Sequence, residues 1–67
     1  MTRRPVTSSH IDSIGWEDEV LEVEFRGGKV YRYEEVPQSE YQALLGADSP
    51  GKYLLQNIDG TYRHTRI

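Results

Sequence analysis

The sequence predicts a small α+β domain. We expect an antiparallel sheet, in the chain order β-β-β-α-α-β, with two short helices packed on one face. Two runs of alternating residues, Val20 to Phe25 and Val30 to Tyr33, flank a Gly-Gly pair as the strands of a hairpin do. After Pro37, two stretches combine helix-capping residues with apolar residues at helical spacing. The 67 residues suit one domain over residues 6–67, after a disordered leader over residues 1–5.

The alternation also predicts the register of the hairpin. Side chains on a strand alternate with a period of two, so the apolar residues of the first strand share one face. A three-residue loop, Arg26-Gly27-Gly28, sets Tyr31 opposite Val23 and Tyr33 opposite Leu21, whereas a two-residue loop would set Val23 opposite an arginine. The longer loop also puts Gly28 at the position that needs positive φ. It pairs Glu22 with Arg32 on the other face.

A first strand is expected before the hairpin. Every second residue from Val6 to Trp16 suggests an alternating strand, although Ile11 breaks the pattern. The acidic pair Glu17-Asp18 favours a turn at its end. After the hairpin, Pro37 cannot continue a central strand.

Two helices and a final strand complete the prediction. Ser39 and Gln42 form a capping box, and Gly46 is a natural C-cap for the first helix. Ser49 is the expected N-cap of the second helix, with Pro50 at its first position. Asp59-Gly60 reads as a turn, and residues 61–67 as the last strand. The predicted core consists of Leu21, Val23, Phe25, Tyr31, Tyr33, Leu44, Leu45, Leu54 and Ile58.

Composition narrows the class of protein. The chain has no cysteine, which fits a reducing compartment, and no apolar run long enough to cross a membrane, so we expect a soluble cytoplasmic protein. A formal net charge of −3 argues mildly against a dedicated nucleic-acid binder, although most basic residues follow an acidic front half and could form a basic face.

The residues resemble the KTSC domain family, named after a C-terminal region of some lysyl-tRNA synthetases and also found as small bacterial and phage proteins. The similarity extends from Val6 to the C-terminus and includes Ile14-Gly15-Trp16, Tyr31-Arg32-Tyr33 and Ser49-x-Gly51-Lys52-Tyr53. The resemblance implies RNA binding, through the association with the synthetase. The chain departs from the family pattern at Leu54 and Leu55, and at Asp59 and Thr61.

No motif indicates catalysis, a cofactor or a metal. Ser8, Ser9, His10 and Asp12 are neighbours, but adjacent residues on a strand point to opposite faces and no nucleophile elbow is present. His10 and His64 lack a spacing that would pair them on a metal. Residues 46–52 match the start of a phosphate-binding P-loop, but the next position is Tyr53 and the segment follows a helix.

We therefore expect a non-catalytic binding module. Its RNA-binding version, for tRNA or single-stranded RNA, depends on basic residues interleaved with aromatic ones in the hairpin and the C-terminal strand. The candidate residues are Arg26, Lys29, Arg32, Lys52, Tyr62, Arg63 and Arg66. The alternative is a protein-interaction module, or a homodimer, that uses an unpaired sheet edge.

Overall fold

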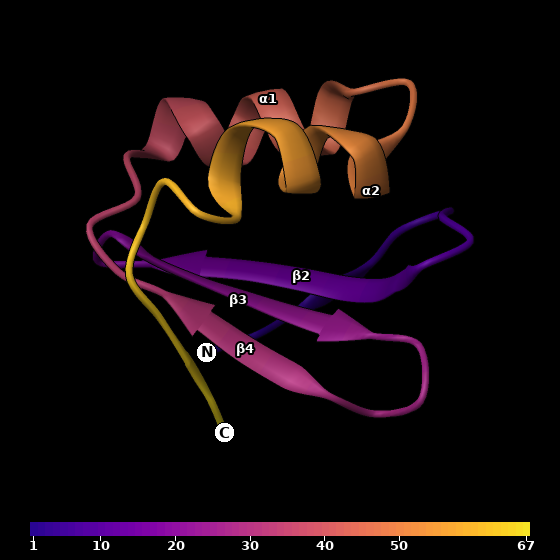
Figure 1. Ribbon diagram of the computed structural model, residues 1–67, viewed down its shortest axis with the longest axis horizontal. Coiled ribbons are helices and arrows are strands. Elements are labelled where there is room, and N and C mark those ends of the chain that lie inside the picture. The colour runs from indigo at the N-terminus through magenta and orange to yellow at the C-terminus, as the bar shows by residue number, and fades with distance from the viewer.

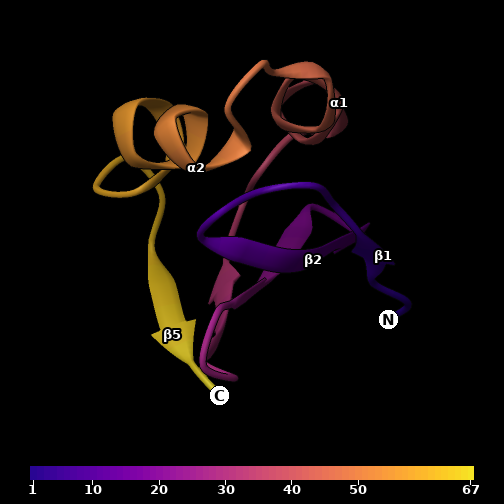
Figure 2. The same cartoon turned by 90° about the vertical axis from the view of Figure 1, so that its right-hand side faces the viewer.

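The fold has two layers, a five-stranded antiparallel sheet and a layer of short helices on one of its faces (Figure 1). The computed structural model describes residues 1–67. The strands follow one another in the sheet in chain order, with β1 and β5 at its two edges (Figure 2). The elements are β1 (Arg4–Pro5), β2 (Ile11–Glu17), β3 (Val20–Phe25), β4 (Val30–Tyr33), α1 (Gln38–Gly46), α2 (Pro50–Tyr53), the π-helical turn η1 (Leu54–Ile58) and β5 (His64–Arg66). The predicted α+β class is confirmed.

The hairpin of β3 and β4 has the predicted register. Val23 lies opposite Tyr31, Leu21 opposite Tyr33, and Glu22 opposite Arg32. The Phe25 N–H donates to the Lys29 carbonyl at 2.8 Å, which closes a loop of three residues, and Gly28 has φ +88°. The pairing puts the apolar residues on the face beneath the helices, which we call the helix-side face. The opposite face is called the helix-free face.

Strand β2 begins later than the sequence suggested. Residues 6–10 form a loop, and the strand starts at Ile11. The register shifts between Ile11, opposite Phe25, and Ser13, opposite Glu24, so Asp12 is the extra residue of a β-bulge. The bulge lets Ile11 and Ile14 both point into the core, where each is fully buried. Ile11 therefore broke the expected alternation because of an inserted residue.

The leader expected at residues 1–5 contains a strand. Arg4 pairs with Ile14 and Pro5 with Ser13 at the edge of the sheet. The chain before β1 crosses the helix-free face so closely that a Cβ placed on Gly15 would lie 2.8 Å from the Thr2 carbonyl oxygen. Backbone pairing and polar contacts hold this segment, and its one large apolar residue, Met1, is 45% exposed, so no alternating apolar pattern predicted its placement.

The first helix begins differently from the prediction, and the second begins as expected. Pro37 is the N-cap of α1 and no side chain caps it, so Ser39 lies inside the helix and the expected capping box is absent. Gly46 is the last helical residue, followed by Ala47 as C-cap in extended conformation. In α2, Ser49 Oγ accepts a hydrogen bond from the Lys52 N–H at 3.4 Å, and Pro50 occupies the first turn.

The core lies between the sheet and the helices. Three buried residues were missing from the predicted set, and three predicted residues (Phe25, Tyr31 and Leu45) are only half-buried at its margin. One of the missing residues, Val36, also accepts a hydrogen bond on its carbonyl from Trp16 Nε1 at 2.8 Å. No helix has the length and apolar character needed to span a membrane. The core residues are Ile11, Ile14, Leu21, Val23, Tyr33, Val36, Leu44, Leu54 and Ile58.

Candidate nucleic-acid interface

Three aromatic rings meet on the helix-side face near the tip of the β3–β4 hairpin. The rings of Phe25 and Tyr31 pack edge to face with centroids 5.3 Å apart, and His64 stacks on Tyr31 at 5.3 Å with an interplanar angle of 11°. We call Phe25, Tyr31 and His64 the ring cluster. Two of the rings are half-buried, and His64 on the edge strand is exposed. The cluster thus presents aromatic surface to solvent beside the hairpin loop.

A groove of about 330 Å³ separates the hairpin from η1. Phe25 and Tyr31 line it on the sheet side, and Leu54 and Leu55 line it on the helical side. Leu55 is 66% exposed, so its side chain is available to a ligand in the groove. The walls are therefore hydrophobic on both sides, an arrangement typical of a site for a flat apolar ring.

Polar groups lie at the rim of this groove. Lys29 and Arg26 line it from the hairpin loop, and Asp59 lines it from the end of η1. The Asp59 N–H donates to the Leu54 carbonyl at 2.7 Å, which fixes the aspartate at the close of the π-helical turn. The Tyr33 hydroxyl donates to Asp59 Oδ1 at 3.4 Å. Burial, together with the neighbouring aspartate, raises the pKa of Tyr33, so its hydroxyl stays a donor.

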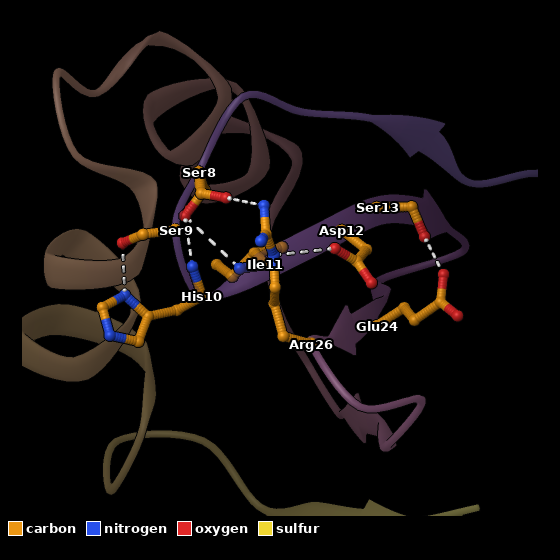
Figure 3. A network of polar contacts seen from close by, with 8 residues as sticks. All are labelled: Ser8, Ser9, His10, Ile11, Asp12, Ser13, Glu24 and Arg26. Carbon is orange, nitrogen blue, oxygen red and sulfur yellow. Dashed lines mark hydrogen bonds and ion pairs between the residues drawn. The ribbon is translucent and has the colours of Figure 1, made fainter.

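The structure brings three of the seven predicted basic and aromatic residues to this region. Lys29 lines the groove and takes part in no ion pair. Arg66, also without an ion pair, lies opposite Tyr31 in the register of β4 and β5, and therefore on the same face. Arg26 is already engaged, because its Nε lies 3.3 Å from Asp12 Oδ1 and its Nη2 donates to the Ser8 carbonyl at 3.1 Å (Figure 3).

The other four predicted residues lie elsewhere, so the seven do not form one surface. Arg32 is on the helix-free face, 3.5 Å from the Glu22 carboxylate. The Tyr62 hydroxyl donates to Glu40 Oε2 at 2.9 Å. Lys52 is exposed on α2, and Arg63 precedes β5, where its carbonyl accepts from the Glu34 N–H at 2.8 Å. Basic or aromatic character in the sequence therefore did not predict that these residues lie on one face of the protein.

The serine and histidine residues before β2 form a turn. Ser8 Oγ accepts from the N–H groups of His10 and Ile11, at 3.2 and 3.3 Å. Ser9 Oγ lies 2.9 Å from His10 Nδ1, but Figure 3 shows the imidazole pointing away from the Asp12 carboxylate, which pairs with Arg26 instead. The serine, histidine and aspartate side chains therefore do not form a catalytic triad. No group of three or more acidic or histidine side chains is placed to hold a metal ion.

Comparison with known proteins gives the family. The model of the KTSC domain matches residues 7–62. The chain belongs to the KTSC domain family. An uncharacterized protein of Stutzerimonas stutzeri is 46% identical over 70 residues, covering 100% of this chain and 99% of the relative. A protein of Tsukamurella paurometabola is 38% identical over 53 residues, which cover 76% of this chain and 79% of that protein.

A solved structure has the same fold as this KTSC domain. The crystal structure of a KTSC domain protein from Yersinia pestis superposes with a TM-score of 0.92 at 38% identity, covering 98% of this chain and 96% of the other. The family similarity predicted from the sequence is thus confirmed along nearly the whole chain.

Several groove residues of the KTSC domain were not predicted as site residues. Leu54 was assigned to the core, Leu55 was noted only as a departure from the family, and Asp59 was assigned to a turn. His64 was not among the seven candidate residues, although it lies opposite Tyr33 in the sheet. Parity within the last strand predicts that His64 and Arg66 share a face, but the register of β5 against β4 is needed to place them beside the tyrosines.

Proposed function

We propose that this KTSC domain is a non-catalytic module that binds single-stranded RNA on the helix-side face of its sheet, next to the β3–β4 hairpin. One observation supports this above the others. Two cations without ion-pair partners, Lys29 and Arg66, lie on the same face as the ring cluster. Unpaired bases stack on exposed rings, while lysine and arginine contact the phosphates.

The net charge of −3 is compatible with this proposal because the basic groups are local. The acidic residues Glu34 and Glu35 line a separate surface beyond the end of β4. Binding should be weak and only modestly salt-dependent, because the slope of log affinity against log salt grows with the number of phosphate contacts and these are few. The proposal places the protein in the cytoplasm, where RNA is available.

Titration of a fluorescent single-stranded RNA, and of tRNA, at several salt concentrations tests the proposal. Removing one cation that binds a phosphate should reduce the slope of log affinity against log salt by about 0.7. Lys29→Ala and Arg66→Ala should each weaken binding and lower this slope. Arg4→Ala is the matched control, because Arg4 is exposed, has no ion pair and lies on β1 at the opposite edge of the sheet. No binding near physiological salt, or equal effects of all three variants, would contradict the proposal.

The free edge of β5 supports a second candidate function, as a protein-interaction module. β5 is the last strand of the sheet and all three of its residues are exposed, so its outer backbone groups can pair with an extended segment. A partner recovered from a cell lysate with the immobilised protein should survive nuclease treatment if this function is correct. Loss of the partner on nuclease treatment would favour RNA binding. Sedimentation at rising concentration tests the version in which the partner is a second copy.

A further inference from the structure

We infer that the groove between η1 and the β3–β4 hairpin binds one guanine base of the RNA, with the Asp59 carboxylate reading its Watson–Crick edge. The inference rests on the proposed function and adds a base preference to it. It depends on the shape of the groove, on the carboxylate at its rim and on the lysine across from that carboxylate.

The shape of the groove suits a flat ring system. Its volume of about 330 Å³ is at the small end of the range of ligand sites, roughly 300–1,000 Å³. Tyr31 lines one side and the exposed Leu55 of η1 lines the other, so a base inserted between them would contact apolar atoms on both faces. Both walls are held in place by packing. Leu54, which is 1% exposed, anchors η1 in the core, and Tyr31 packs against two neighbouring rings.

The carboxylate of Asp59 is free to accept further hydrogen bonds. It forms no ion pair with any cation of the chain, and its one hydrogen bond comes from the Tyr33 hydroxyl to Oδ1. An ionised carboxylate has two oxygens with about four acceptor positions, so most of its capacity remains. The π-helical turn holds the Asp59 backbone, and the hydrogen bond from the Tyr33 hydroxyl holds Oδ1 at the groove.

Guanine is the base whose hydrogen-bond donors match the two oxygens of the Asp59 carboxylate. It has two adjacent N–H donors on its Watson–Crick edge, at N1 and at the exocyclic amino group, and they can bind the two oxygens of one carboxylate. Adenine and cytosine each have one amino group beside a ring acceptor, and uracil has one N–H between two carbonyls. These three bases would set an oxygen or nitrogen lone pair against Asp59. Lys29, at the hairpin side of the groove, can donate to the guanine carbonyl or to a phosphate.

A set of uridine oligonucleotides of about eight residues, a length that one small domain can cover, tests the inference. The central residue is uridine, guanosine, adenosine or inosine, and affinity is measured by fluorescence anisotropy at low salt. The guanosine oligonucleotide should bind about tenfold more tightly than the adenosine one, which is the discrimination of one good bidentate contact. Inosine, which lacks the amino group, should fall between them.

Variants of the rim show which residue reads the base. Asp59→Asn should abolish the preference for guanosine, and its affinity for the all-uridine strand should be unchanged or higher, because a negative charge is removed. Tyr33→Phe should reduce the preference by releasing the carboxylate. Asp48→Asn is the matched control, since Asp48 is exposed and lines a surface on the β1 side of the molecule.

The failures of this inference and of the proposed function are distinguishable. Binding of all oligonucleotides with equal affinity, or a guanosine preference that Asp59→Asn retains, would overturn the inference and leave RNA binding in place. No binding of any oligonucleotide would overturn both.

Discussion

Glu22 and Arg3 form an ion pair across the helix-free face of the sheet, with Oε1 of the glutamate 3.3 Å from Nη1 of the arginine. Glu22 is the one buried charged residue, and its side chain is 5% exposed. Arg32, on the neighbouring strand, lies 3.5 Å from the same oxygen. The chain before β1 therefore supplies half of the charge compensation for a carboxylate at the centre of the sheet.

Replacing Glu22 should destabilise the protein more than replacing either arginine. Glu22→Gln leaves two guanidinium groups facing each other, and we expect the free energy of unfolding to fall by about 1–3 kcal/mol. Arg3→Ala should cost less, because Arg32 still compensates the charge. Urea unfolding measures both values, with Glu17→Gln as the control, since Glu17 is exposed and forms no ion pair. A Glu22→Gln variant as stable as the control would show that the pairing is not needed.

Gly15 allows the N-terminal segment to lie against the sheet. An alanine Cβ there would be 2.8 Å from the Thr2 carbonyl oxygen and 3.3 Å from the Arg3 Cα, both backbone atoms. Gly15→Ala should therefore displace the segment and lower stability by about 1–3 kcal/mol. Faster amide exchange at Val6, whose N–H donates to the Asp12 carbonyl at 3.2 Å, should accompany the destabilisation.

Gly46→Ala is the control for Gly15→Ala. Nothing lies within 4 Å of a Cβ at Gly46, and its backbone is helical, so alanine should be neutral or stabilising by up to about 1 kcal/mol. If both glycine variants behaved alike, the close approach at Gly15 would not be the cause.

Core and groove residues should differ in what their truncation costs. Ile11 is fully buried, and Ile11→Ala should cost about 2–5 kcal/mol in thermal or urea unfolding. Phe25 is half-buried at the groove, so Phe25→Ala should cost less stability and weaken binding of single-stranded RNA. A larger loss of stability for Phe25→Ala than for Ile11→Ala would return Phe25 to the core, as the sequence suggested.

The alternation of side chains between the two faces of a strand explains why some elements could be predicted from the sequence and others could not. The hairpin register followed from one requirement, that Val23, Tyr31 and their neighbours share a buried face. The same reasoning failed at Ile11, because a bulge adds a residue that no local pattern reveals. β1 was missed because backbone pairing needs no apolar residue. Parity also placed Arg32 on the other face, opposite Glu22, but only the pairing of β4 with β5 shows that Arg66 lies on the same face as Lys29.

Tyrosine ionisation should destabilise the protein in alkali. The pKa values of Tyr53 and Tyr62 are raised, the former mainly by its hydrogen bond to Glu40 and the latter mainly by burial, with Glu40 contributing. Burial, reinforced by Asp59, raises the pKa of Tyr33 further. In the unfolded chain these hydroxyls lose protons near pH 10. Above that pH the native state binds more protons than the unfolded state, so stability falls as pH rises.

The alkaline decline in stability should depend mainly on Tyr33. Stability should be independent of these groups below about pH 9 and should decline above about pH 10, measured by urea unfolding at each pH. In Tyr33→Phe the decline should be shallower, because the most strongly shifted group is gone. Tyr41→Phe is the control, since the Tyr41 hydroxyl has no hydrogen bond to an acidic side chain. An equally steep decline in Tyr33→Phe and the wild type would mean that the buried tyrosine does not determine the alkaline limit of the fold.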